Sequence, residues 1–177
     1  MPRIPYLPAD LAEPAEIVAA VRARRGGRLL NLDRMLLHSP SFTRGWNAHL
    51  GAVRRELTLE PRLRELAICA VAALNEDVYE HQQHAPEFLA AGGSAAQLEA
   101  LRDPEAAARD GALFDSAGRA AIGLAIEMTR QVRVSDAAFA AARAAFPSER
   151  QLVELVGVIA TFNMVSRFLL ALGVDPE

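Results

Sequence analysis

The stretch Leu63–Leu74 limits the possible folds more than any other part of the chain. A helix formed there would be apolar on nearly every side, and a helix without a polar face has to be surrounded by other elements. Asn75 ends the stretch, and a second helical pattern follows at once and closes at Gly92 and Gly93. We therefore expect a central, buried helix that packs closely against the next helix in the chain.

Helix-favouring residues also dominate the remainder of the sequence. Ala, Leu, Arg and Glu are frequent, aromatic residues account for 6%, and clusters of β-branched residues are scarce, so helix propensity exceeds strand propensity almost everywhere. The sequence predicts an all-α fold. The further helical segments that we expect are 14–25, 28–39, 41–57, 95–101, 116–131, 136–146 and 149–172, with an acidic, polar connection over 103–111.

Capping signals predict several helix starts, because a side-chain oxygen just before a helix can accept one of its free backbone N–H groups. Three pairs have the capping-box pattern: Asp77 with Glu80, Ser94 with Gln97, and Ser148 with Gln151. Thr58 is expected to cap the Leu63–Leu74 helix, with Pro61 in its first turn.

The length of 177 residues suits one domain, because a single hydrophobic core commonly holds about 100–200 residues. Residues 1–13 contain three of the ten prolines and no helical periodicity. They are expected to form an extended arm that lies on the body of the protein or on a neighbouring subunit. Residues 14–177 are expected to form a single helical domain.

The distribution of charge disfavours nucleic acid as a partner, and the pattern of apolar residues disfavours a membrane span. The formal net charge is −3, and the 19 basic residues are scattered rather than gathered into a stripe with aromatic residues. Nucleic acid is therefore not expected as a partner. The apolar segment 151–172 is interrupted by Glu154, Asn163, Ser166 and Arg167, which favours a core helix that reaches a subunit interface over a membrane span.

Two features favour the cytoplasm. The sequence near the N-terminus has no apolar core of signal-peptide length, and the single cysteine, Cys69, cannot form an internal disulfide. Because Cys69 lies in the buried Leu63–Leu74 helix, where apolar surroundings raise a thiol pKa, we expect it to act as a small hydrophobic residue rather than as a nucleophile.

Glu65 is a charged side chain near the start of this otherwise apolar helix. One interpretation places its carboxylate at the edge of the core, or inside it with a partner. The alternative is a surface glutamate that pairs with Arg62 or Arg64. The sequence pattern alone leaves both open.

Asp77, Glu80 and His84 follow at i, i+3 and i+7, which places them along one face of the next helix. They can converge on one pocket, where an imidazole and carboxylates suit proton transfer. However, Asp77 and Glu80 would form a capping box without any catalysis, and His84 would serve equally as a hydrogen-bonded core histidine. Functional and structural roles both remain open.

His81 and His84 are three residues apart, so both imidazoles could reach one metal ion, with Glu80 or Glu65 as an oxygen ligand. The sequence has no HExxH and no CxxC motif, and no phosphate-binding or dinucleotide fingerprint. We therefore expect neither a metal site nor another cofactor.

Two segments resemble a known family. A REL helix start is followed by AALNEDVYEHQQHAPEFLAAGG, which resembles the Tyr-Glu-x-x-x-His core motif of the carboxymuconolactone decarboxylase family. The segment FNMVSRFLLALGV, with Asn163 and Arg167, is similar to the C-terminal helix of that family. The similarity spans about residues 30–174. It implies a helical bundle of the alkylhydroperoxidase D-like type.

In the alkylhydroperoxidase D-like branch, a Cys-x-x-Cys pair opens the second helix four residues ahead of a histidine, and a glutamate on the preceding helix completes a proton relay. The resemblance assigns the glutamate and the histidine of this relay to Glu65 and His84. Asp77 and Glu80 occupy the two cysteine positions. An ordinary cysteine peroxidase mechanism therefore lacks its dithiol.

The resemblance implies a cofactor-independent acid–base enzyme, a decarboxylase, lyase or isomerase that acts on a small carboxylated or lactone compound. Its catalytic residues are expected to be Glu65, Glu80 and His84. Its substrate-binding residues are expected to be Asp77, Tyr79 and His81. The alternative is a non-catalytic or regulatory member in which these residues only cap and cross-link helices. A peroxidase or peroxiredoxin-type activity is a weaker third interpretation.

Apolar surface predicts self-association. The helices at 63–74 and 151–172 are apolar on most faces, and the 116–131 helix is rich in Ala, Ile and Leu. This is more apolar helix surface than one modest bundle can hide. The family resemblance likewise implies dimers, trimers or hexamers. We expect a homo-oligomer in which the 151–172 helix contributes to the interface and the Glu65 and His84 region lies near a subunit boundary.

Overall fold

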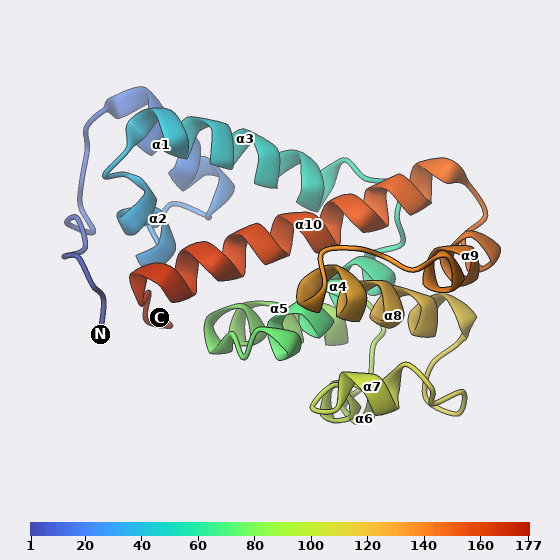
Figure 1. Cartoon of the computed structure of the whole chain (residues 1–177). Helices are drawn as coiled ribbons and strands as arrows, with labels where there is room; N and C mark the ends of the chain where they lie inside the picture. The colour runs from blue at the N-terminus through green and yellow to red at the C-terminus, as the bar shows by residue number, and fades with distance from the viewer. The chain divides into compact units, whose positions relative to one another are not determined.

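The computed structural model describes residues 1–177, which form ten α-helices and no strand (Figure 1). The all-α prediction is confirmed. In chain order the helices are α1 (Ala15–Arg24), α2 (Asn31–Leu36), α3 (Pro40–Arg55), α4 (Pro61–Leu74), α5 (Val78–Ala90), α6 (Ala95–Ala100), α7 (Pro104–Ala107), α8 (Ser116–Arg130), α9 (Asp136–Ala145) and α10 (Glu149–Leu172).

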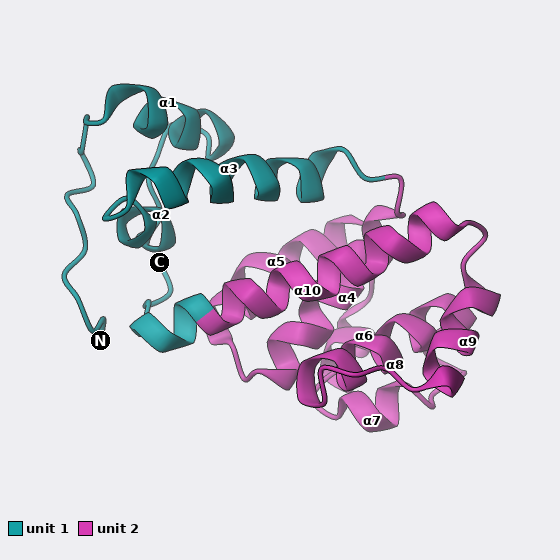
Figure 2. Cartoon of the chain, turned by 45° about the horizontal axis from the view of Figure 1, so that its top comes forward, with its two compact units in different colours: residues 1–57, 168–177 teal, residues 58–167 magenta.

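The chain divides into two compact units (Figure 2). Unit 1 comprises residues 1–57 and 168–177, and unit 2 comprises residues 58–167. Residues 1–13, where the arm was expected, contain no helix. The division into this arm and one domain over 14–177 stays a prediction.

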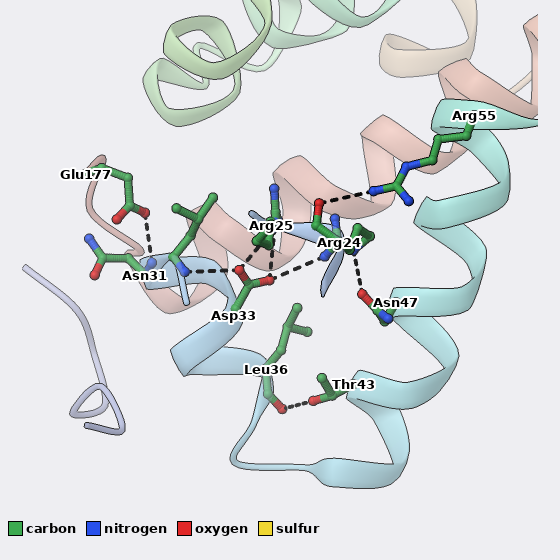
Figure 3. A network of polar contacts seen from close by, with 10 residues as sticks. Arg24, Arg25, Asn31, Asp33, Leu36, Thr43, Asn47, Arg55 and Glu177 are labelled. Atoms are coloured by element: carbon green, nitrogen blue, oxygen red, sulfur yellow. Dashed lines mark hydrogen bonds and ion pairs between the residues drawn. The ribbon is translucent and has the colours of Figure 1, made fainter. Parts of the chain in front are cut away.

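A polar network around Asp33 ties together helices α1, α2 and α3 of unit 1 (Figure 3). The Asp33 carboxylate is 1% exposed, accepts the backbone N–H of Leu30, and pairs with Arg24 at 3.4 Å and Arg25 at 3.1 Å. Arg24 also donates to the side-chain oxygen of Asn47 at 2.5 Å. Burial, reinforced by the charge of Arg25, lowers the pKa of Arg24 to about 10. Helices α1 and α2 therefore meet at one buried carboxylate, and α3 joins the network through the contact of Asn47 with Arg24.

Helix α4 forms the centre of unit 2. Its residues 66–72 are at most 1% exposed, because both α5 and α8 pack against it, while α9 packs on α8. The part of α10 in unit 2 adds the buried residues Leu155, Ile159 and Phe162. The prediction of a central, buried helix paired with the next one is confirmed.

The predicted caps are present at α5 and α6. Ser94 and Gln97 form both hydrogen bonds of the predicted capping box. The box predicted for Asp77 and Glu80 is incomplete, because Asp77 accepts the backbone N–H of Glu80 but its own N–H donates to the Ala72 carbonyl. At α10 the box is also incomplete. The Ser148 hydroxyl accepts the backbone N–H of Gln151, but the Gln151 side chain donates to the carbonyl of Thr58 instead.

Two predictions between the helices are wrong. Thr58 does not cap α4, because its N–H and its hydroxyl both donate to the Glu154 carboxylate at 2.8 Å, a charged acceptor that competes with the capping geometry. The connection expected over 103–111 contains the short helix α7. Asp103 caps it by accepting the backbone N–H of Ala106, and Pro104 stands in its first turn.

Helix α10 is long and apolar enough to cross a membrane by length and composition alone. Half of its most apolar window is buried inside the protein. Its Asn163 side chain is also buried, and donates to the Thr129 hydroxyl at 2.9 Å and to the Ile159 carbonyl at 3.0 Å. The core helix of a soluble protein can have the same length and composition.

Candidate functional site

Glu65 and His84 meet in the interior of unit 2. Glu65 lies one turn into α4, which begins at Pro61, and His84 lies in the second turn of α5. The close packing of these two helices brings Nδ1 of His84 to 2.6 Å from Oε2 of Glu65. The two side chains are only 3% and 2% exposed. The contact is therefore a short hydrogen bond that water does not reach freely.

A second carboxylate faces the other nitrogen of the same ring. Glu80 lies one turn before His84 on α5, and its Oε2 is 3.4 Å from Nε2 of His84. The Glu80 side chain is 5% exposed. The imidazole is thus held between two buried carboxylates that come from different helices.

Two further side chains fix this arrangement. The Phe162 ring of α10 meets the His84 ring edge-on, with 4.9 Å between the ring centroids. Arg64 donates to Oε1 of Glu65 at 3.1 Å, and its side chain is 16% exposed. The interpretation of Glu65 as a buried carboxylate with a partner is confirmed. The surface interpretation is wrong, although the pairing with Arg64 is present.

The geometry defines where protons can reside. A protonated imidazole donates from both nitrogens and can serve both carboxylates. A neutral imidazole donates from one nitrogen and accepts at the other. The carboxyl group that faces the accepting nitrogen can form a hydrogen bond there only when it is itself protonated. The three groups can therefore hold a proton and pass it along a short path in a region shielded from bulk water.

Asp77 is positioned as the cap of α5. Its carboxylate accepts the backbone N–H of Glu80 at 3.1 Å, and the residue is 2% exposed. Burial raises the pKa of Asp77, although the N–H of Glu80 and the Ser166 hydroxyl act in the opposite direction. A positive charge on the His84 imidazole would also lower the pKa of Asp77.

The other two expected substrate-binding residues lie apart from each other. Tyr79 is buried, at 4% exposure. His81 is exposed and lines an open hollow at the start of α5 together with Asp77. The structure therefore does not place His81 beside His84, and no group of three or more His, Cys, Asp or Glu side chains has a metal-binding arrangement.

A known family model matches the part of the chain that contains the site. Residues 40–123, which include Glu65, Asp77, Glu80 and His84, match the model of the carboxymuconolactone decarboxylase family. The resemblance to this family is confirmed. No curated protein matches the chain in sequence.

Solved structures confirm the alkylhydroperoxidase D-like fold. An uncharacterized peroxidase-related protein from Silicibacter sp. TM1040 is 20% identical, with a TM-score of 0.80 over 99% of this chain and 94% of that one. An alkylhydroperoxidase AhpD core from Ralstonia eutropha JMP134 is 20% identical, with a TM-score of 0.79 over 99% and 92% of the two chains. The debrominase Bmp8, solved with 2,3,4-tribromopyrrole, is 12% identical, with a TM-score of 0.77 over 100% and 94%. At these identities the likeness concerns the fold alone.

Within this carboxymuconolactone decarboxylase-like core, the lone cysteine is poorly placed to react. Cys69 is 1% exposed, one turn after Glu65 on α4. Burial raises the pKa of its thiol to about 12, and the negative charges of Glu65 and Glu80 add to the effect. The expectation of a small, buried, unreactive residue agrees with this environment.

Two residues of the site were not singled out from the sequence. Phe162 was only one apolar residue among many on a core helix, and nothing in its spacing indicated a contact with His84. Arg64 was considered only as a surface partner for Glu65. The REL motif at the helix start was the available signal, because a basic residue beside a buried acid often pairs with it.

Proposed function

We propose that the protein is a cofactor-independent acid–base enzyme that acts on a small carboxylated or lactone compound, as a decarboxylase, lyase or isomerase. The observation that carries the proposal is the position of His84, whose two ring nitrogens face the buried carboxylates of Glu65 and Glu80. Enzymes use such shielded imidazole–carboxylate groups to move protons to and from carbon.

His84 is the group that exchanges a proton with the substrate, and Glu65 holds and balances the imidazole. In a decarboxylation, the bond to the carboxyl carbon breaks, carbon dioxide leaves, and the electron pair stays on the substrate as an enolate. The protonated imidazole then delivers its proton to the substrate carbon that carried the carboxyl group. In an isomerisation, the neutral imidazole first removes a proton next to a carbonyl group and then returns it to a different carbon.

The remaining assignments belong to the same proposal. Asp77, Tyr79 and His81 contribute to substrate binding near the start of α5. The protein works in the cytoplasm as a homo-oligomer, without a cofactor, a nucleic-acid partner or a membrane partner. Support comes from the apolar helix surfaces and from the family match over residues 40–123.

Proton exchange at carbon tests the proposal directly. Small lactones and carboxylic acids with a hydrogen next to the carbonyl group are incubated with the protein in deuterated water, and NMR follows loss of the carbon-bound proton. We expect exchange by the native protein and a large loss of exchange in Glu65→Gln. Equal exchange in the native protein and in Glu65→Gln would contradict the assignment. Glu127→Gln is a suitable control, because the Glu127 carboxylate accepts hydrogen bonds from the backbone N–H and the hydroxyl of Ser135, between α8 and α9.

A non-catalytic role is the second candidate, and one observation favours it. Asp77 caps α5 through the N–H of Glu80, and Glu65 pairs with both Arg64 and His84, so these residues already serve the packing of two helices. Under this alternative, substitutions at Glu65 and His84 lower stability and change no catalytic rate.

A further inference from the structure

The two carboxyl groups that flank the His84 ring are held differently. At one nitrogen, Nδ1 of the ring lies 2.6 Å from Oε2 of Glu65, which is a short hydrogen bond. At the other, Nε2 lies 3.4 Å from Oε2 of Glu80, which is longer than an ordinary N–H···O hydrogen bond. The imidazole is therefore fixed tightly at Nδ1 and loosely at Nε2.

A cation stands on the tightly held side. Nε of Arg64 donates to Oε1 of Glu65 at 3.1 Å, so the two oxygens of this carboxyl group serve two different partners. The Arg64 side chain is only 16% exposed, and that of Glu65 is 2% exposed. Little water screens the pair, so the charge of the guanidinium acts strongly on the acid that it touches.

This cation determines where the proton of the short contact resides. A charged guanidinium favours the ionised form of the carboxyl group that it contacts. An ionised carboxylate can only accept hydrogen bonds, so the proton between Glu65 and His84 belongs to Nδ1 of the ring. When the ring is neutral it has no second proton, and Nε2 carries the free electron pair.

The other titratable groups near the ring do not fix it in this way. On α5, Asp77 caps the helix, and burial raises its pKa. On α4, the Cys69 thiol has a pKa of about 12 and stays neutral. From α10 the ring meets Phe162, which has no charge, and on α8 the Asp115 carboxylate is paired at the surface with a different arginine. Arg64 is thus the cation whose contact acts on the ring through Glu65.

We propose that Arg64 is a positioning residue that keeps Glu65 ionised, so that Glu65 holds the imidazole with its proton on Nδ1 and Nε2 is the nitrogen that exchanges a proton with the substrate. This inference rests on the proposed function and deepens it, because it identifies the reacting nitrogen and the residue that selects it. Arg64 acts through Glu65 and does not need to touch the substrate.

The native protein provides a first test that needs no substrate. Nitrogen NMR of the histidine rings distinguishes the charged ring from the Nδ1–H and Nε2–H forms of the neutral ring. The chain has four histidines, and the signals of His84 are those that disappear in His84→Gln. We expect the neutral ring of His84 to carry its proton on Nδ1. A neutral ring with its proton on Nε2 would overturn the proposal, whatever the behaviour of the variants described next.

Two substitutions at Arg64 separate its charge from its packing. Arg64→Gln removes the charge and keeps a hydrogen-bond donor, whereas Arg64→Lys keeps the charge. Loss of a nearby positive charge makes the coupled imidazole and carboxyl groups bind protons more tightly. The pH at which the His84 ring titrates should therefore rise by about one pH unit in Arg64→Gln and stay close to the native value in Arg64→Lys.

Arg62→Gln is the matched control. Arg62 lies on the same helix, its side chain is 21% exposed, and it forms ion pairs with Glu60 and Asp115 rather than with Glu65. Its replacement removes a comparable guanidinium and should leave the titration of His84 unchanged. A folded Arg64→Gln protein in which His84 titrates as in the native protein would show that Arg64 only packs against the site, and would overturn the proposal.

Proton exchange at carbon distinguishes failure of this inference from failure of the proposed function. If both hold, the pH profile of exchange moves upward in Arg64→Gln together with the ring titration, and does not move in Arg62→Gln. The expected ring form and titration without any exchange by the native protein would support the role of Arg64 in holding the ring and contradict the function. Exchange that requires His84 but keeps its native pH profile in Arg64→Gln would support the function and overturn the inference.

Discussion

His84 contacts a carboxylate oxygen at each ring nitrogen, at 2.6 Å and 3.4 Å, and all three side chains are buried. His84→Gln keeps an amide donor but cannot accept and return a proton. We expect the rate on an identified substrate to fall by about 10²–10⁴-fold. Steady-state kinetics and thermal unfolding are measured on the same samples. A rate that falls only as far as the folded fraction falls would support the structural role.

Replacement of Cys69, unlike replacement of His84, should leave the acid–base rate nearly unchanged. The Cys69 thiol has a pKa of about 12 and lies in the core, so it supplies almost no thiolate at neutral pH. Cys69→Ser should leave the acid–base rate within about twofold at a temperature where the protein remains folded, and neither protein should reduce organic hydroperoxides with a dithiol reductant. A robust peroxidase rate that disappears in Cys69→Ser would contradict this account.

At the level of elements, the cap of α5 responds to pH. Burial raises the pKa of Asp77 in the folded protein, so its contribution to stability is fully present below its unfolded pKa and is lost as pH rises through the folded pKa. Asn caps a helix about as well as Asp and has no charge to bury. Asp77→Asn should therefore become more stable relative to the native protein as pH rises from about 4 to 7. Urea unfolding at several pH values measures this, and a difference that shrinks with pH would contradict the prediction.

The helices were predictable where local chemistry determines their ends. Asp77 and Ser94 cap α5 and α6 as expected, because a cap depends on residues only three positions apart. Thr58 was assigned wrongly because its partner, Glu154, lies far away in the sequence. Helix α7 was missed because a polar, acidic segment gives little apolar periodicity, although Asp103 and Pro104 carried its start signal.

The candidate site was predictable only in part. Helical periodicity put Asp77, Glu80 and His84 on one face, but the contact between Glu65 and His84 joins two helices, and the family resemblance was needed to expect it. His81 is three positions from His84, yet it is exposed. The rotation of α5 about its own axis follows from the packing of residues such as Phe88, which spacing alone does not reveal.

At the scale of the whole molecule, the prediction of a homo-oligomer stays untested. Several large apolar side chains of unit 2 are exposed, including Val153, Val132 and Met164. Exposed apolar side chains on a core helix favour contact with another subunit. Size-exclusion chromatography with light scattering at micromolar concentration should give a mass of at least twice 19.1 kDa. A mass of 19.1 kDa that does not change with concentration would contradict it.

The burial of one cysteine makes the opening of the core measurable. Alkylating reagents attack a thiolate, and Cys69 can become one at a useful rate only when α4 separates from its neighbours and the thiol meets water. The alkylation rate of the native protein therefore reports how often the centre of unit 2 opens. Any molecule that binds only the closed form slows this reaction in proportion to its occupancy. The single thiol would thus report the binding of an uncoloured ligand, with no added label and no catalytic assay.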